Sequence, residues 1–591
     1  MSKGNSIDVT WPNTYTNLDN LKAIRKSTIP LHQTFPYSKS STPLSRSRQV
    51  LPTEILQQIV SNFSLPPLLD TTTPTFSPIS KQTLQSLRLT SYLFNFLATP
   101  LLFHTLVLRV DAASAETLLA LSSDRHDPSV ADLPRVSRYI RCLCFNLDCY
   151  LKDVASDRNA FHTFHELALD RMLLSNAQAH GLRITSYRQI HEDVDASSDE
   201  SVKTRFSKTL SSWNALLSLW DPHCPPLFPS RGQSALTRSA LSGAVDHGFN
   251  RYHERYQEQK RLLKNGSRSI FLKYLVTAVK NMPLLKHAIL CDSRLLDNTP
   301  FNDPHRILAD PETLSQFLSR PHSWDKCAYS SASYTISTGS LLIELPIAFS
   351  RANTQLHTLE LRTFLTHNLS LFQRKTPVWK LLETSCQSLK SFSVDVAQEP
   401  QVAGVQYHIV HMNNIASHLR LTENFHLDLG PTSGNPFITQ YFASILSGES
   451  LRALRLNSDA VCAITSTNEP ATVDLSTAKA TLSRLSTLKL INISIDSSEM
   501  EEFVGFLGPN LRELSMTRIH FASGTFSNTL RLLRDYIADR GGECTVHMRD
   551  WVAGSPQRPE DGHLQLLTDR AERYVNGEDA VNLASLVEMV P

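Results

Sequence analysis

The stretch Leu356-His-Thr-Leu-Glu-Leu361 recurs three times downstream with the same spacing of apolar residues. The copies are Leu451-Arg-Ala-Leu-Arg-Leu456, Leu485-Ser-Thr-Leu-Lys-Leu490 and Leu511-Arg-Glu-Leu-Ser-Met516. In each copy the last two apolar residues stand two positions apart, as a strand with one buried face requires. The stretches therefore predict short strands that all bury the same face.

Weaker copies extend this pattern toward the N-terminus. They run from Leu389 to Val394 and from Leu285 to Leu290, and Tyr139 to Phe145 is a candidate early member. From 356 onward, copies that follow one another start 26 to 34 residues apart, as from 485 to 511 and from 451 to 485, and a degenerate unit at 425–429 fills the gap between 389 and 451. A strand and a returning helix fit this period. We therefore expect an α/β fold, an irregular leucine-rich repeat solenoid in which neighbouring units complete each other's core.

A small all-helical module is expected before the repeats. Order begins at Leu51-Pro-Thr-Glu-Ile-Leu56, where Pro52 suits a first helical turn and apolar residues recur at helical spacing. A Pro/Thr/Ser-rich loop over 66–80 leads to a second helical segment, Leu84–Leu97, which Pro100 is expected to end. Leu106 to Leu108 is read as a first strand.

The chain is thus divided into six expected regions. These are a flexible tail (1–49), the helical module (50–108), the start of the repeat domain (109–150), an insertion or large loop (151–275), the repeat-like domain (276–540) and a C-terminal polar segment (541–591). Within the insertion, the acidic run Glu192–Glu200 is expected to be solvated, and Arg251–Arg261 to form an exposed helix.

Composition favours a soluble intracellular protein, cytoplasmic or nuclear. The 58 basic and 56 acidic residues nearly balance, which argues against a dedicated nucleic-acid binder but leaves a local basic patch open. No apolar run is long enough to cross a membrane, and no secretory signal is expected. The nine cysteines are scattered without a paired framework, as in a reducing compartment.

No catalytic or metal-binding motif stands out, so we expect no catalytic residue, cofactor or metal. His162, His165 and Glu166 would share one helix face, but without a further ligand cluster we expect ordinary surface side chains. Cys142 and Cys144 alternate along a predicted strand and are expected to be small buried hydrophobes.

Three segments in order, Leu51–Leu56, Leu87–Phe94 and Pro100–Leu106, resemble an F-box, and the whole chain resembles a fungal F-box protein with a degenerate leucine-rich repeat domain. The resemblance implies docking on a Skp-type adaptor, and through it on a cullin. It assigns the adaptor-binding surface to Leu51, Pro52, Ile55, Leu56, Ile59, Leu87, Leu89, Phe94 and Leu102. The link over 65–83 is longer than the family's usual connection.

The resemblance therefore implies the substrate-recognition subunit of a cullin-based ubiquitin ligase, with a protein target on the repeats and no nucleic-acid or membrane partner. A first alternative is an interaction scaffold outside any ligase, in which the N-terminal helices cap the repeats. A second is an enzyme whose site lies in the insertion at 150–275. The burial of the N-terminal helices and a cleft of titratable residues in the insertion would distinguish these alternatives.

Overall fold

The structure is a computed structural model. It describes residues 78–90, 92–122, 136–179, 200–220, 237–264, 268–291, 303–322, 338–362, 376–394, 436–457, 482–491, 494–495, 497–517, 519–521, 526–539, 543–549, 552–553 and 569–577. The predicted tail, the predicted first helix at 51–63 and the degenerate unit at 425–429 lie outside this part of the chain.

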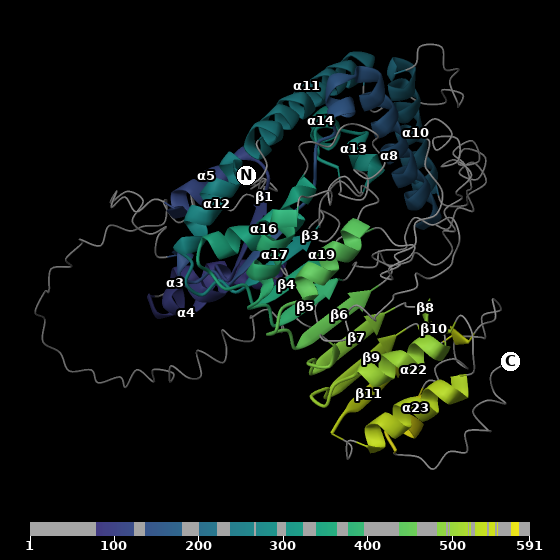
Figure 1. Ribbon diagram of the computed structural model, residues 1–591. Helices are drawn as coiled ribbons and strands as arrows, with labels where there is room; N and C mark the ends of the chain where they lie inside the picture. Colours follow the sequence, from purple (N-terminus) through teal and green to yellow (C-terminus); the bar gives the residue numbers. More distant parts are fainter. Residues whose placement is uncertain are drawn as a thin grey trace, which may run out of the picture.

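A sheet of nine parallel strands runs through the described residues (Figure 1). Each strand pairs with the next one along the chain, so spatial order follows sequence order. The strands are β1 (Thr105–Arg109), β2 (Cys142–Asn146), β3 (His287–Cys291), β4 (Thr358–Arg362), β5 (Ser391–Val394), β6 (Ala453–Asn457), β7 (Thr487–Ile491), β9 (Glu513–Thr517) and β11 (Thr545–Arg549). All six predicted repeat stretches, and the early candidate at 139–145, supply strands of this sheet.

A smaller parallel sheet accompanies the C-terminal strands. It joins β8 (Ser494–Ile495), β10 (His520–Phe521) and β12 (Val552–Ala553), with β10 in the middle. Each of its strands follows closely on a strand of the large sheet. The chain therefore forms a second short strand at the same place after β7, after β9 and after β11.

Helices cover one face of the large sheet (Figure 1). Neighbouring helices pack in chain order, and their apolar side chains form one core with the leucines of the strands. They are α5 (Ala112–Ser122), α12 (Ile270–Lys280), α16 (Leu341–Arg351), α17 (Thr376–Cys386), α19 (Pro436–Leu446), α22 (Ser497–Phe506) and α23 (Phe526–Ala538).

The sequence of α12 shows why such a helix forms and which side it buries. The Ser269 hydroxyl caps it by accepting a hydrogen bond from the backbone N–H of Leu272 at 3.3 Å. Five buried residues, spaced at 0, 1, 4, 7 and 8 positions, form one stripe: Phe271, Leu272, Leu275, Ala278 and Val279.

The long interval between β2 and β3 is largely helical where it is described. It contributes α7 (Lys152–Ser156), α8 (Arg158–Ala179), α10 (Glu200–Trp220) and α11 (Arg238–Leu263), and α11 packs on α14 (Pro311–Leu318), which follows α13 (Pro304–Ile307). A short 3-10 helix, Thr338–Ser340, precedes α16.

Helix α11 is anchored to the carboxyl ends of β1 and β2 by two buried polar side chains. The Tyr252 hydroxyl accepts a hydrogen bond from the Leu151 N–H at 2.7 Å. The Gln259 amide accepts from the Tyr150 N–H at 3.0 Å and donates to the carbonyls of Val110 and Asp148. The expectation of an exposed helix at 251–261 is therefore wrong for Tyr252 and Gln259, which are buried.

Two helices, α3 (Pro78–Thr90) and α4 (Tyr92–Leu102), precede β1 and pack on each other. Helix α3 begins inside the segment predicted as a loop, and Pro100 lies within α4, two residues before its end. The predicted helical stretch is thus present as two helices. The predicted stop at Pro100 is early by two residues.

The C-terminal segment predicted as polar adds the last strand of the sheet. β11 buries Val546 and Met548 on the helix-covered face, and residues 569–575 form a further helical segment beside it. The polar side chains of β11 occupy its other three positions, so a strand with one buried face was hidden in a polar composition.

Candidate protein-docking surfaces

The helix pair α3–α4 buries a small apolar centre of its own. Leu84 and Ala98 are fully buried, and partly buried apolar residues pack on them: Phe94, Leu97, Leu101 and Leu102. Two large apolar side chains remain outside this centre, Leu89 with 70% and Phe96 with 60% of its surface exposed. Exposed apolar side chains that form a contiguous patch can mark a contact site for a partner protein.

The structure divides the predicted adaptor-binding residues into three groups. Leu51, Pro52, Ile55, Leu56 and Ile59 lie outside the described residues. Phe94 and Leu102 pack on the centre of the helix pair, Leu87 is half-buried, and Leu89 is exposed. Leu89 is therefore the described member of the predicted set with a largely free apolar surface.

Phe96 was missed by the sequence analysis, although its signal was available. It stands two residues after Phe94 on α4, and positions two apart on a helix point in nearly opposite directions. Because Phe94 packs inward, Phe96 has to face outward. The sequence Tyr-Leu-Phe-Asn-Phe-Leu holds more apolar residues than one helix face can bury.

The second face of the large sheet, opposite the helices, carries the first and third residue of each strand and the fifth residue of each five-residue strand. At β2 and β3 this face is buried and holds three thiols, with Cys144 Sγ 3.4 Å from Cys291 Sγ. Burial raises the pKa of the Cys142 thiol well above its ordinary value, so this group is not a thiolate nucleophile. The prediction that Cys142 and Cys144 are buried is confirmed.

A buried trio of polar side chains lies beside the thiols, on β3 and β4. Glu360 Oε1 is 2.9 Å from His287 Nε2, and Glu360 Oε2 is 2.6 Å from Arg362 Nη2 and 2.9 Å from Arg362 Nε. Burial alone would raise the pKa of Glu360, but its contacts with His287 and Arg362 outweigh that effect and lower it. The carboxylate is ionised and held from two sides, as in a structural network.

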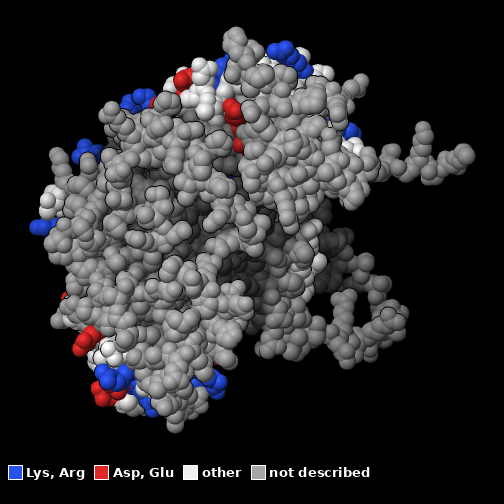
Figure 2. Space-filling model, turned by 90° about the vertical axis from the view of Figure 1, so that its right-hand side faces the viewer, with Lys and Arg blue, Asp and Glu red and all other residues white. Residues whose placement is uncertain are grey.

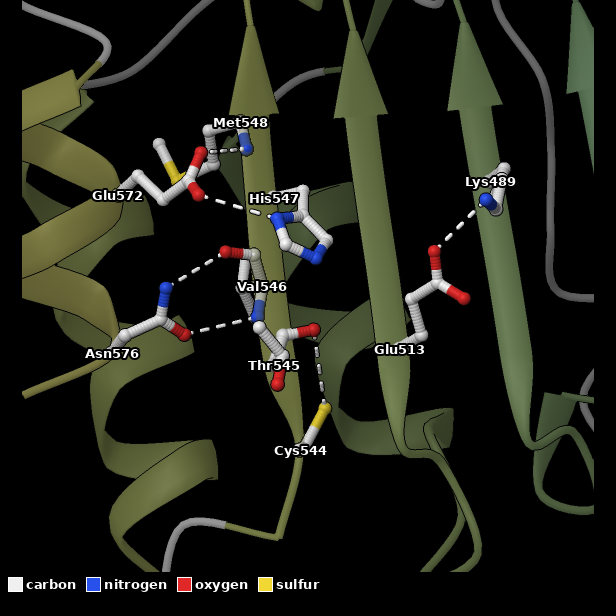
Figure 3. A network of polar contacts seen from close by, with 9 residues as sticks. All are labelled: Lys489, Glu513, Cys544, Thr545, Val546, His547, Met548, Glu572 and Asn576. Carbon is white, nitrogen blue, oxygen red and sulfur yellow. Dashed lines mark hydrogen bonds and ion pairs between the residues drawn. The ribbon is translucent and has the colours of Figure 1, made fainter. Parts of the chain in front are cut away.

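At the C-terminal strands the same face carries polar side chains that are partly exposed or exposed, several of which are drawn in Figure 3. Lys489 on β7 and Glu513 on β9 form an ion pair at 2.9 Å with both side chains partly exposed, and His547 and Arg549 on β11 are exposed. Glu572 accepts a hydrogen bond from the Met548 N–H at 2.8 Å and lies 3.2 Å from His547 Nδ1. This polar, solvent-facing strip is suited to contact another protein.

The helical interval contains an aromatic cluster around His165. This histidine is buried, with its ring 4.5 Å from that of Phe161 and 5.7 Å from that of His322, so the expectation of a surface side chain is wrong at this position. His162 stacks on Trp220, and burial, helped by Arg158, lowers the His162 pKa to about 4. Among the described residues, no group of three acidic, His or Cys side chains is placed to hold a metal ion.

Cysteine pairing departs from the expectation at one position. Cys149, whose backbone pairs with His322, is disulfide-bonded, whereas Cys142, Cys144, Cys291, Cys386 and Cys544 are free thiols. In the described part of the chain, no helix combines the length and apolar character that crossing a membrane requires.

Comparison with protein-family models and with curated proteins found no match to this chain. The function is therefore argued from the chain's own surfaces.

Proposed function

We propose that this chain recruits a target protein to a cullin-based ubiquitin ligase. In this proposal α3, α4 and the segment before them form an F-box-like module that docks on a Skp-type adaptor, and the parallel sheet with its helices is an irregular leucine-rich repeat solenoid that holds the target. The observation that carries it is the exposure of Leu89 and Phe96 on a helix pair directly preceding the first strand.

The mechanism in this proposal is proximity. A target held on the solenoid is kept near a ubiquitin-charged enzyme, which raises the effective concentration of the target's lysines. The chain itself supplies geometry and specificity, and bond formation takes place elsewhere in the assembly. The accessible strip on β7, β9 and β11 offers polar side chains for target contact.

The test is co-purification of a Skp-type adaptor with the full chain and with Leu89→Glu/Phe96→Glu. Loss of buried apolar anchors at an interface costs about 2 kcal/mol or more each, so the double variant is expected to lose the adaptor. Leu119→Glu and Leu381→Glu are matched controls, because these leucines are 48% and 49% exposed on α5 and α17. Both control variants should retain it.

Two outcomes would overturn the proposal. One is an adaptor that binds the wild type and the double variant equally. The other is a wild type that binds no adaptor, which favours the scaffold in which the helices cap the solenoid. Leu51→Ala/Pro52→Ala, checked for folding, extends the same test to the predicted first helix.

A further inference from the structure

A row of positively charged and histidine side chains follows the edge of the sheet at which the strands begin. One residue stands immediately before each of eight strands, and from the second strand on its N–H donates to the carbonyl of the equivalent residue one strand earlier, at 2.7 to 3.1 Å. In order these residues are His104, Arg141, Lys286, His357, Lys390, Arg452, Ser486 and Arg512. All but Ser486 are basic or histidine. We call these seven the basic ridge.

These backbone hydrogen bonds place the ridge residues in a single row along this edge of the sheet. Adjacent strands lie about 4.8 Å apart, so eight positions span about 34 Å. Arg141, Lys286, Lys390, Arg452 and Arg512 are exposed, and the two histidines are half-exposed. The backbone N–H and carbonyl groups along this row are hydrogen-bonded to one another. A partner therefore meets side chains and not a free strand edge.

The charges on the ridge are close enough to act on one another. Burial lowers the pKa of His357, and the positive charges of Lys390 and Lys286 lower it further. Burial likewise lowers the pKa of His104, with Arg141 adding to the effect. Like charges held side by side cost free energy that an anionic partner would relieve.

Among the described residues of the turns, acidic side chains do little to neutralise the ridge. The described turns that lead into β2–β9 contain one, Glu449, and they add two further arginines, Arg138 and Arg484. On the side of the molecule drawn in Figure 2, the described charged residues that are visible include both signs. The ridge is thus a local basic feature on a chain whose formal net charge is only +2.

From this row we infer that the ridge binds an extended acidic segment of a partner protein, which would be the target class of the proposed function. A single file of charges about 34 Å long matches roughly ten residues of extended chain. Nucleic-acid grooves add aromatic stacking platforms, and the ridge positions hold no Phe, Tyr or Trp. The inference depends on the proposed function for the fate of the bound protein but not for binding itself.

The test measures binding of a fluorescent ten-residue glutamate-rich peptide to the full chain, without adaptor, at 50 and 200 mM salt. Arg141→Glu/Lys286→Glu/Lys390→Glu should weaken binding at least tenfold at the lower salt and flatten its salt dependence. The matched control is Lys208→Glu/Arg261→Glu/Lys273→Glu, which makes the same change in net charge at exposed positions on α10, α11 and α12 and should bind as the wild type does. The corresponding triple Gln variant should weaken binding less than the triple Glu variant.

Equal weakening in the control and ridge variants would overturn the inference, because it would show a general charge effect. So would failure of the wild type to bind the peptide, or equal binding of a glutamine-for-glutamate peptide. Single-stranded RNA and phosphatidylserine vesicles are run in parallel, and tighter ridge-dependent binding to either would overturn the assignment to a protein. Because no adaptor is present, a negative result here leaves the adaptor test unaffected.

Discussion

At the scale of single residues, the buried carboxylate of Glu360 contributes most clearly to folding. It faces His287 and Arg362 in a region where all three side chains are buried, so removing its charge takes from the Arg362 guanidinium the carboxylate that lies 2.6 Å from it. Glu360→Gln is expected to lower the free energy of unfolding by about 3 kcal/mol at pH 7. Urea denaturation followed by circular dichroism measures this change.

The surface pair Lys489–Glu513 is the matched comparison for Glu360. Its side chains are 26% and 36% exposed, and pairs of this kind contribute about 0–1 kcal/mol. Equal losses in Glu513→Gln and Glu360→Gln would contradict the argument from burial. Because the folded-state pKa of Glu360 is lowered, its stabilisation is present above the ordinary carboxyl pKa and is lost as pH falls through the lowered value. The wild type should therefore lose its advantage over Glu360→Gln on acidification below about pH 4.

At the scale of elements, the close approach of α11 and α14 depends on one glycine. A Cβ atom at Gly248 would lie 2.8 Å from the Cβ of Leu318, whereas a Cβ at Gly243 on the same helix would meet nothing within 4 Å. Gly248→Ala should destabilise the fold by about 1–3 kcal/mol through overpacking. Gly243→Ala should stabilise it by about 0.5–1 kcal/mol through helix propensity. Denaturant titrations of both variants check the two signs, and a stable Gly248→Ala would contradict this packing.

The sequence predicted elements better than it predicted how distant elements meet. The leucine spacing located strands because a strand with one buried face leaves a local period of two, as Leu359 and Leu361 do. It did not reveal the anchoring of α11, because Tyr252 contacts Leu151, 101 residues away. Nor did it reveal the burial of Glu360, which sits at a position of β4 whose counterparts on β7 and β9, Lys489 and Ser515, are partly exposed.

The candidate docking surfaces were predictable in part. The F-box resemblance pointed to α3 and α4, but the direction of each side chain depends on how the two helices pack, and this placed Phe94 inward and Phe96 outward. The basic ridge was present in the sequence as the residue after the first leucine of the leucine-patterned stretches, as in Leu389-Lys390 and Leu451-Arg452. Recognising these residues as one row required the register of the strands, because only the pairing of neighbouring strands brings residues 62 positions apart, such as Lys390 and Arg452, side by side.

At the scale of the whole molecule, the large sheet has an edge strand at each end, β1 and β11. The unpaired backbone groups of an edge strand promote association with other chains. The segment 569–577 protects the β11 edge (Figure 3). The Asn576 amide accepts from the Val546 N–H at 3.0 Å and donates to the Val546 carbonyl at 2.8 Å, and Glu572 accepts from the Met548 N–H. These side chains replace the hydrogen bonds that a tenth strand would make.

Asn576→Ala should therefore open this edge. Leaving a partly buried backbone donor and acceptor unpaired costs about 1–3 kcal/mol, which is local to β11 and small beside the stability of the core. Hydrogen exchange should accelerate in residues 543–549 while β4 stays protected, and light scattering should show concentration-dependent self-association. Asn576→Asp, which keeps the acceptor for Val546 N–H but loses the donor, should fall between the wild type and Asn576→Ala, and Asn250→Ala on the exposed side of α11 should leave both measurements unchanged. If exchange at β11 is the same in Asn576→Ala as in the wild type, the strand edge is protected by something other than this amide.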